Sequence, residues 1–478
     1  MPLPSPSTSP ARRTRGSATG SSSNGRTRAG RGPVEYVRAS LPRSLARRVL
    51  LALLICLGWV AWHRHSRSSS RSPLKVQLAR PEHRVPHPSH PAADAPNALI
   101  HRRVVAVADL HGDYEHALNV LEMANLIDAR PSARLEDGTP RWTGGHDVLV
   151  STGDIVDRGA DTIKLYRMFA SLREQAAAQD PPGAVYNNLG NHEVMNALRD
   201  WRYVTGPDLD SFGGPQARRA AMSADGWIGK EWLEQYNITS SVDLLPVDFL
   251  PEDYDVPRAN FVHGGITPAY AQAGNRSRKD GALERINRIG NSFLRKALSN
   301  PNPDGHLPPG TTREEAELYS SDGPLWYRGY ALDESDDEVC QRAEKAAQAL
   351  GVEHLIMGHT PNFDGFVVRC PQARILLIDT GISRAYGGEQ SALVFDTELQ
   401  RAPTPDIEKQ IGAGPEAVIP GREAGTKIRV GQADGDEGVS QLEHAKGMHR
   451  WVERRSVTAL YWRRVPKILH MGERDVWL

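Results

Sequence analysis

The chain has 478 residues, of which 39% are hydrophobic and 24% charged, so it is long enough for one large or two ordinary globular domains. Its formal charge of zero is unevenly distributed, because residues 1–48 carry ten arginines and one acid, whereas residues 101–478 carry 42 basic and 55 acidic residues. An acidic body argues against broad nucleic-acid binding, so no nucleic-acid partner is expected, although bound cations could still attract a phosphate substrate.

The N-terminal region predicts a tail, an apolar segment and a stalk. Residues 1–48 are rich in Ser, Pro, Gly and Arg, which predicts a disordered basic tail. Val49–Trp62 are fourteen apolar residues without a charge, fewer than the roughly 20 that usually span a bilayer. The long leader and the lack of an evident cleavage site favour an uncleaved signal-anchor or transmembrane segment over residues 49–64. Residues 65–100 are typical of a stalk or linker.

Compartment is predicted from weaker signals. Sequons at Asn237 and Asn275 favour a single-pass protein of the endomembrane system with the main body of the chain in the lumen. The Arg- and Ser-rich, acid-poor leader also fits a mitochondrial location, which stays an alternative. The chain has three cysteines and no CxxC pair, which makes a structural zinc site unfavourable. Cys340 and Cys370 could pair in an oxidising compartment, and two free buried thiols fit the sequence equally well.

Residues 101–400 alternate short apolar runs with amphipathic helical patterns, which predicts one α/β domain with parallel strand pairs. Residues 196–258 and 267–350 read as long helical or irregular inserts and are expected to form a cap over a site. Residues 401–478 form a C-terminal extension. Within that extension, the basic and aromatic residues 449–468 predict a docked C-terminal helix, with a membrane-surface contact as the alternative.

Several predicted strands end in residues of the types that bind metals. In chain order these residues are Asp109 and His111, then Asp154, then Asn191 and His192, then His263, and finally His359. Each motif alone has an ordinary structural explanation, such as a turn, a helix N-cap or a core histidine. Together they indicate one site, because ligand sites in α/β sheets lie outside the carboxyl ends of the strands. Carboxylates, imidazoles and an amide oxygen suit Mn, Fe or Zn.

The ordered series D-x-H, GD-x-x-D-R-G, GNHE, HGG and GHT closely resembles the calcineurin-like metallophosphoesterase superfamily. The segments "GNHEVMNALRDWRYV", "PLWYRGY" and "DTGISRAYGG" resemble the Shewanella-like protein phosphatases in particular. The resemblance covers about residues 100–397. It implies an α/β (α+β) fold with a central β-sandwich of mixed sheets, flanking helices and helical cap inserts.

The resemblance also implies a site for two divalent metal ions. It assigns the first ion to Asp109, His111 and Asp154, and the second to Asp154, Asn191, His263 and His359. Asp154 would then bridge the two ions, which would explain why the stretch "STGDIVDRGADT" crowds three aspartates together.

Roles in catalysis are carried over from the same resemblance. His192, paired with Asp157, matches the acid that protonates the leaving oxygen. Arg158 matches a clamp on the phosphate, Arg328 is a second candidate clamp, and Tyr386 would line the cleft. Two cations would make water reactive toward phosphorus, so neither a phosphoenzyme nor a nucleophilic Ser or Cys is expected.

The predicted function is therefore a metal-dependent phosphomonoesterase acting on phosphoproteins, tethered to a membrane by its N-terminal apolar segment. The same chemistry on a small phosphate ester or nucleotide is the nearest alternative. An inactive, membrane-tethered interaction protein is disfavoured, because no metal ligand of the series is missing.

Overall fold

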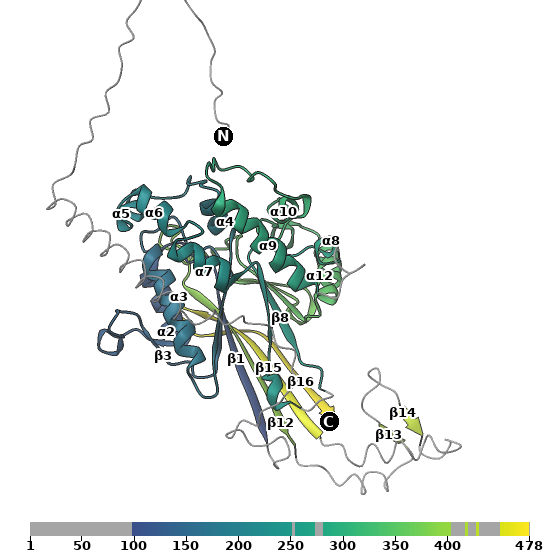
Figure 1. The fold of residues 1–478 in the computed structure, drawn as a ribbon. Helices are drawn as coiled ribbons and strands as arrows, with labels where there is room; N and C mark the ends of the chain where they lie inside the picture. The colour runs from purple at the N-terminus through teal and green to yellow at the C-terminus, as the bar shows by residue number, and fades with distance from the viewer. Residues whose placement is uncertain are drawn as a thin grey trace, which may run out of the picture. The chain divides into compact units, whose positions relative to one another are not determined.

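The computed structural model describes residues 98–250, 254–272, 281–402, 416–418, 427–429 and 450–477 (Figure 1). The predicted basic tail, the apolar segment and almost all of the stalk lie outside these residues. Among the residues that are described, none of the helices combines the length and apolar character needed to cross a bilayer.

The larger of two main sheets has seven strands in the order β16-β15-β12-β1-β4-β5-β6. Its strands are β1 (Leu99–Val107), β4 (Val148–Ser151), β5 (Ala184–Asn188), β6 (Tyr236–Asn237), β12 (Ser391–Arg401), β15 (Arg450–Tyr461) and β16 (Lys467–Trp477). Strands β1, β4, β5 and β6 run parallel, whereas β12, β15 and β16 are joined in antiparallel pairs. The sheet is therefore mixed, and its parallel half is the part predicted from the alternation of strands and helices.

The second sheet has five strands in the order β10-β11-β9-β8-β7. Its strands are β7 (Thr239–Asp243), β8 (Arg258–Val262), β9 (His354–Met357), β10 (Val367–Arg369) and β11 (Ile375–Leu377). The central strands β8, β9 and β11 are parallel. Two small pairs complete the strands, namely β2 (Ile127–Asp128) with β3 (Arg141–Trp142) and β13 (Glu416–Val418) with β14 (Lys427–Arg429).

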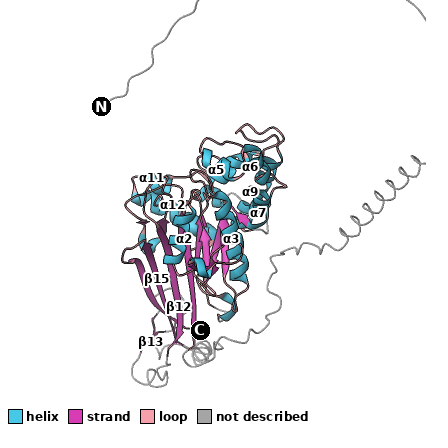
Figure 2. Cartoon of the chain, turned by 90° about the vertical axis from the view of Figure 1, so that its left-hand side faces the viewer, coloured by secondary structure: helices cyan, strands magenta, loops and turns pink. Residues whose placement is uncertain are grey.

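The two main sheets pack face to face. One buried cluster joins Val104 and Val150 of the larger sheet to Phe261, Ile356 and Leu376 of the smaller one. A ring contact between Phe261 and Phe395, with centroids 6.4 Å apart, crosses the same interface. Figure 2 shows the strands as a central layer between helices. This sandwich of mixed sheets confirms the fold class expected from the resemblance.

Helices cover the outer faces of the sandwich and connect its strands. They are α2 (Tyr114–Met123), α3 (Thr162–Ala177), α4 (Asn191–Ala197), α5 (Gly206–Ser211), α6 (Pro215–Ala221), α7 (Trp227–Gln235), α8 (Pro268–Gln272), α9 (Ala282–Ser299), α10 (Arg313–Leu318), α11 (Gly329–Leu332) and α12 (Asp336–Leu350). Short 3-10 turns lie at Pro131–Ala133, Val247–Phe249 and Pro371–Ala373. In Figure 1, α2 and α3 lie on one side of the strands, and α9 and α12 lie on the other.

The predicted C-terminal helix is wrong, because residues 450–461 and 467–477 form strands β15 and β16. The residues alternate along the second half of β15: Val457, Ala459 and Tyr461 are buried, while Thr458 and Leu460 between them are partly exposed. This period of two is typical of a strand that covers a core on one face. The two strands extend the same sheet that contains β1.

The two long inserts contain more core structure than a cap would. Residues 236–243 supply β6 and β7, one strand to each sheet, and α9 and α12 belong to the second insert. Phe293 and Leu294 of α9 and Val339 and Ala343 of α12 are fully buried in the core rather than placed over a site. Helices α9 and α12 therefore belong to the core, because their apolar faces pack against it, although both helices lie within a long insert of the sequence.

Cys340 and Cys370 are joined by a disulfide bond, which links α12 to the segment after β10. Their Cα atoms lie 5.4 Å apart. Of the two alternatives left open by the sequence, the structure therefore has the bridge and not two free thiols.

Candidate active site

The predicted ligands converge because every one of them follows the carboxyl end of a strand. Strands β1, β4 and β5 are parallel neighbours in one sheet, and β8 and β9 are parallel neighbours in the other. The residues concerned are Asp109, His111, Asp154, Asn191, His263 and His359, each at most 5% exposed. In Figure 1, α4, which begins at Asn191, lies beyond the ends of these strands.

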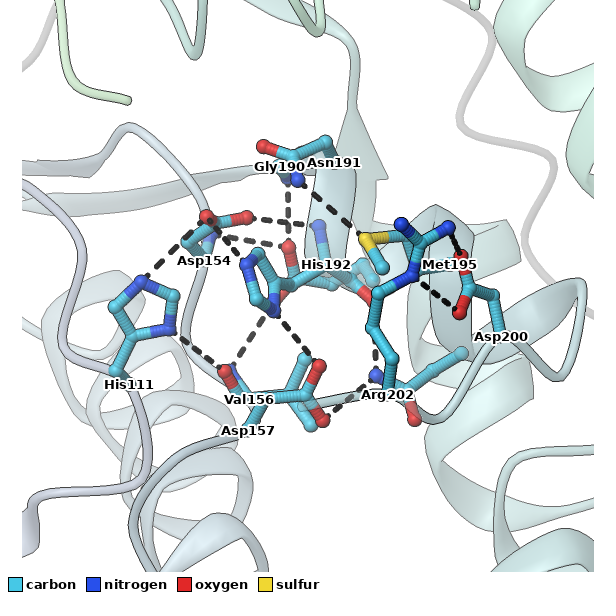
Figure 3. Close-up of polar contacts among 12 residues, drawn as sticks. His111, Asp154, Val156, Asp157, Gly190, Asn191, His192, Met195, Asp200 and Arg202 are labelled. Carbon is cyan, nitrogen blue, oxygen red and sulfur yellow. Dashed lines mark hydrogen bonds and ion pairs between the residues drawn. The ribbon is translucent and has the colours of Figure 1, made fainter. Parts of the chain in front are cut away.

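Asp154 is the centre of the site. Its Oδ2 atom lies 3.7 Å from Nε2 of His111, 3.8 Å from Nε2 of His192 and 3.3 Å from Nε2 of His263. Its Oδ1 atom accepts a hydrogen bond from the backbone N–H of His192 at 2.9 Å (Figure 3). One carboxylate thus meets side chains from three other strand ends, which is the arrangement expected of a shared ligand.

Two groups of potential ligand atoms share this carboxylate. Asp154, His111 and His192 form one group, and Asp154, His263 and His359 form the other, with the ligand atoms of each group within 4.8 Å of one another. Asp109 lies outside both groups, and His192 takes its place in the first. The ligand atoms of the second group are three of the four expected around the second ion.

Asp109 and Asn191 nevertheless lie at the same site. The carboxylate of Asp109 accepts hydrogen bonds of 3.2 Å from the backbone N–H of His359. The Oδ1 atom of Asn191 lies 2.8 Å from Nε2 of His263, while its Nδ2 donates to the sulfur of Met195 at 3.6 Å (Figure 3). The Met195 contact leaves the amide oxygen, the atom that can bind a cation, facing the histidines.

Electrostatics at the site favour bound cations. Burial, together with the carboxyls of Asp379 and Asp154, raises the pKa of Asp109 well above its ordinary value. Burial also raises the pKa of Asp379 to about 6. Burial alone would raise the pKa of Asp154 too, but the facing imidazoles of His263 and His192 lower it well below the ordinary value. Three buried carboxyl groups therefore share one small volume, and positive charge there would stabilise them.

Two of the imidazoles, those of His111 and His359, are in the neutral form that binds metals. Burial lowers the pKa of His111 to about 4, and burial with the neighbouring His263 and Arg328 lowers that of His359 to about 2. The buried Nδ1 atom of His263 has no hydrogen-bond partner. Neutral imidazoles, carboxylates and an amide oxygen form a donor set that fits divalent metal ions.

Close approach of two loops produces this geometry. A Cβ atom on Gly153 would lie 2.4 Å from the backbone nitrogen of Gly190, and one on Gly190 would lie 2.0 Å from Oδ1 of Asp154. Only glycine fits at either position, so the GD and GN motifs can touch. Six of the predicted site residues also have positive φ angles between 41° and 72°, namely Asp109, His111, Asp154, Asp157, Arg158 and His359. Strained backbone of this kind clusters at functional sites.

Glu193 fixes the loop that carries Asp154, and no role was predicted for it. Its buried carboxylate accepts hydrogen bonds from the backbone N–H groups of Asp154, Ile155 and Gly190 at 2.7–3.0 Å, and from the hydroxyl of Tyr166 at 3.2 Å. The signal was available, because a Glu at the third position of a helix is typical of a capping box.

His192 and Asp157 form the predicted pair. The Nδ1 atom of His192 lies 2.7 Å from Oδ2 of Asp157, and both residues are buried (Figure 3). Burial lowers the pKa of His192, but the carboxylates of Asp154 and Asp157 outweigh it, so the net shift is upward. The pair leaves Nε2 of His192 directed toward Asp154, where it can serve either as an acid or as a ligand.

Arg158 is held between two aromatic rings. Its guanidinium carbon lies 4.5 Å from the ring centre of Tyr203 and 4.7 Å from that of Tyr386. The same rings contact the site, with Tyr203 4.9 Å from the imidazole of His192 and Tyr386 5.4 Å from that of His111. Tyr386 therefore lies at the site, beside His111 and Arg158. Tyr203 was not predicted, because it lies in an insert where no spacing rule distinguishes it.

Two further arginines shape the rim. Nη1 of Arg328 donates to the backbone oxygen of His359 at 2.7 Å and to Oγ1 of Thr360 at 2.9 Å, which places Arg328 beside a predicted ligand. Arg384 forms a two-pronged pair with the buried carboxylate of Asp113 at 2.8–2.9 Å. This second pair anchors the loop that carries Tyr386, and no sequence pattern predicts it.

Buried carboxylates and imidazoles at the strand ends of this sandwich of sheets form a candidate metal site. Residues 102–363 match the family model "Calcineurin-like phosphoesterase", and the chain belongs to this family. It is 37% identical over 292 residues to an uncharacterized protein of Schizosaccharomyces pombe, covering 61% of this chain and 76% of that protein.

Named relatives point to the same group. The chain is 27% identical to Shewanella-like protein phosphatase 2 of Arabidopsis thaliana over 59% of this chain and 72% of the relative. It is 23% identical to Shewanella-like protein phosphatase 1 of Plasmodium berghei, covering 59% and 67% of the two chains. A cold-active protein-tyrosine phosphatase of a psychrophilic Shewanella aligns with a TM-score of 0.43 and 24% identity, covering 62% of this chain and 77% of that one. The two named relatives from Arabidopsis and Plasmodium confirm the resemblance to the Shewanella-like protein phosphatases.

Proposed function

We propose that the protein is a dinuclear-metal phosphomonoesterase that hydrolyses phosphoproteins. The observation that carries the proposal is Asp154, whose single carboxylate belongs to two groups of buried ligand atoms. His111 and Asp109 would complete one ion's shell, and Asn191, His263 and His359 would complete the other. When bound, two such ions lower the pKa of water and stabilise charge on a phosphoryl group.

The residues around the ligands divide the remaining work. The guanidinium of Arg158, restrained by two tyrosine rings, would bind the phosphoryl oxygens, with Arg328 beside His359 as a second clamp. His192 would donate a proton from Nε2 to the leaving oxygen, because Asp157 occupies its Nδ1 atom. Each of these groups is held by contacts within the protein, as electrostatic preorganisation requires.

A protein substrate is supported by the relatives, two of which are named protein phosphatases. The test is hydrolysis by the purified full-length chain with added Mn²⁺, first of p-nitrophenyl phosphate and then of a phosphopeptide library set against a panel of nucleotides and sugar phosphates. We expect turnover of phosphopeptides to exceed that of the small esters. We expect chelation to reduce the activity by at least about 10²-fold. Activity that survives exhaustive chelation, or that is confined to nucleotides, would contradict the proposal.

We also propose that the predicted apolar segment at residues 49–64 tethers the enzyme to an endomembrane with the catalytic domain in the lumen. The disulfide between Cys340 and Cys370 supports an oxidising compartment, and Asn237 is exposed, as a glycan acceptor must be. A glycosidase-induced mobility shift that is lost in Asn237→Gln is the expected result. A protein imported into mitochondria without any glycan would overturn this placement.

A further inference from the structure

Arg218 is a buried cation that contacts the residues around the candidate site, and it comes from a short helix at the surface. Helix α6 has seven residues, and Arg218 is its only buried one, with 0% of its surface exposed. Its neighbours Gln216, Ala217, Arg219 and Ala220 are all exposed. Fully buried arginines are rare unless they are paired. This short surface helix therefore directs a single side chain into the protein, and that side chain is charged.

Each nitrogen of the Arg218 guanidinium has an acceptor. Its Nη2 donates to Oδ1 of Asp157 at 3.2 Å, its Nη1 to Oδ1 of Asn196 at 2.6 Å, and its Nε to Oδ2 of Asp208 at 2.9 Å. The ring of Trp201 lies 5.2 Å from its guanidinium carbon. The planar group is thus fixed in position and orientation, in a way that a flexible ammonium could not reproduce.

The contacts continue to the catalytic imidazole. Oδ1 of Asp157 accepts from Arg218 and also from Nδ2 of Asn196 at 2.9 Å, while Oδ2 of the same carboxylate faces Nδ1 of His192 at 2.7 Å. Nδ2 of Asn196 also donates to the backbone oxygen of His192 at 2.9 Å. The carboxylate that orients His192 is therefore itself oriented by Arg218, both directly and through Asn196.

A merely structural role explains this arrangement poorly. Burying a charge in a helix-to-core contact is costly, and apolar side chains of similar volume often fill such a space with equal or better stability. An arginine is needed where a buried carboxylate must keep both its charge and its direction. Asp157 is such a carboxylate, because it is 0% exposed and one of its oxygens is committed to His192.

We propose that Arg218 is a positioning residue of the hydrolytic reaction: it holds the carboxylate of Asp157 in the orientation from which His192 protonates the leaving oxygen. This inference rests on the proposed function. It extends the machinery from the strand-end loops to the insert that carries α6, which the family signatures do not include. The proton passes from Nε2 of His192 to the oxygen of the departing alcohol, and Arg218 exchanges no proton.

The experiment compares leaving groups. Protonation matters most when the leaving alcohol is strongly basic, so Arg218→Met should reduce kcat for a phosphoserine peptide by about 10–100-fold and kcat for p-nitrophenyl phosphate by less than about 3-fold. Arg218→Lys, which keeps the charge, should recover part of the difference. Arg219→Met is the matched control, because Arg219 belongs to the same helix and also stacks on Trp201, at 5.1 Å, but is exposed.

A double-mutant cycle with His192→Asn separates this inference from the proposed function. If Arg218 acts through His192, adding Arg218→Met to His192→Asn should change kcat by less than about 2-fold. A wild-type chain without phosphatase activity would refute the proposed function itself. Equal losses on all leaving groups, full activity of Arg218→Met, or a further large loss in the His192→Asn background would each overturn the role of Arg218. Arg218→Gln, which retains an amide donor, provides the same comparison if the Met variant does not fold.

Discussion

Two regions of the molecule bury carboxylates, and they neutralise them in different ways. In strand β15 of the larger sheet, Glu453 is 1% exposed and is paired with Arg455, Arg474 and the hydroxyl of Tyr254. At the strand ends, the charged groups that act on Asp109 are two further carboxyls, those of Asp379 and Asp154, and both raise its pKa.

The pKa values of Glu453 and Asp109 are shifted in opposite directions because their neighbours carry opposite charges. Burial raises the pKa of Glu453, but Arg474 and Tyr254 outweigh it and lower it below the ordinary value. Burial and like charges act together to raise the pKa of Asp109. A buried carboxylate alone therefore says little about function, because the decisive observation is whether the protein supplies the compensating charge itself. Glu453 is compensated by side chains of the protein, whereas Asp109 can be stabilised by taking up a proton or by a cation from outside.

The largest effect that would separate the two regions is expected for Asp154→Asn. The amide cannot provide the charge that two ions share, so we expect a loss of about 10³-fold or more in kcat and a fall in co-purified metal. Metal content by atomic emission and turnover of p-nitrophenyl phosphate measure both. Normal metal content with wild-type turnover would show that Asp154 is not a shared ligand.

The reciprocal variant is Glu453→Gln. It leaves Arg455 and Arg474 without their buried partner, so we expect unfolding to become about 2–3 kcal/mol easier, with metal content and kcat close to those of the wild type. Chemical denaturation at neutral pH measures the difference. A loss of bound metal in this variant would end the distinction between the regions.

The acid dependence of the same variant provides a second check. Because the folded-state pKa of Glu453 is lowered, its stabilisation is complete above the ordinary carboxyl pKa and is lost as the pH falls through the folded-state value. The stability difference between wild type and Glu453→Gln should therefore shrink as the pH is lowered below about 4.5, the ordinary value for Glu. A constant difference across this range would show that the carboxylate charge is not the source.

The carboxylates and imidazoles at the strand ends could be predicted from the sequence, whereas the buried position of Glu453 and its partners could not. Asp109, Asp154 and His263 each follow a short apolar run, so local pattern and the geometry of parallel strands place them at one edge. Glu453 lies in a strand predicted as a helix, because a basic and aromatic composition hid the alternation of buried residues. Its partner Tyr254 is 199 positions away in the chain, and no local rule connects them.

The residues that contact and orient the ligands and the His192–Asp157 pair were also not predicted. Tyr203 and Arg218 lie in inserts whose path is set by tertiary packing. Asp379 was also missed, although it follows a short apolar run as the predicted ligands do. Glu193 is a further exception, because its capping position could have been recognised. Residues placed by the end of a strand can thus be predicted from local sequence patterns. Residues that orient them cannot, because their positions depend on contacts between segments that are distant in the chain.

A smaller effect sharpens the assignment within the site. His192→Asn should reduce kcat by about 10²-fold if His192 is the acid, because a positioned proton donor contributes at least that much. Metal content should then stay near the wild-type value, since Asp109 remains to complete the first shell. Loss of one ion from this variant would instead make His192 a ligand, as its place in the first group of ligand atoms allows.

The smallest expected effect concerns the rings around Arg158. Tyr203→Leu removes one face of the aromatic sandwich, and a single cation–π contact at a half-exposed position contributes about 0.5–1 kcal/mol, so KM for a phosphopeptide should rise about 2–5-fold with little change in kcat. Tyr203→Phe keeps the ring and should match the wild type within about 2-fold. If both variants raise KM alike, the hydroxyl rather than the ring of Tyr203 is what matters. If neither does, Arg158 is oriented by its backbone N–H, which donates to the backbone oxygen of Tyr203 at 3.1 Å. The distinction bears on the whole site, because Arg158 and Arg328 are the two cations proposed to bind phosphate beside its buried carboxylates.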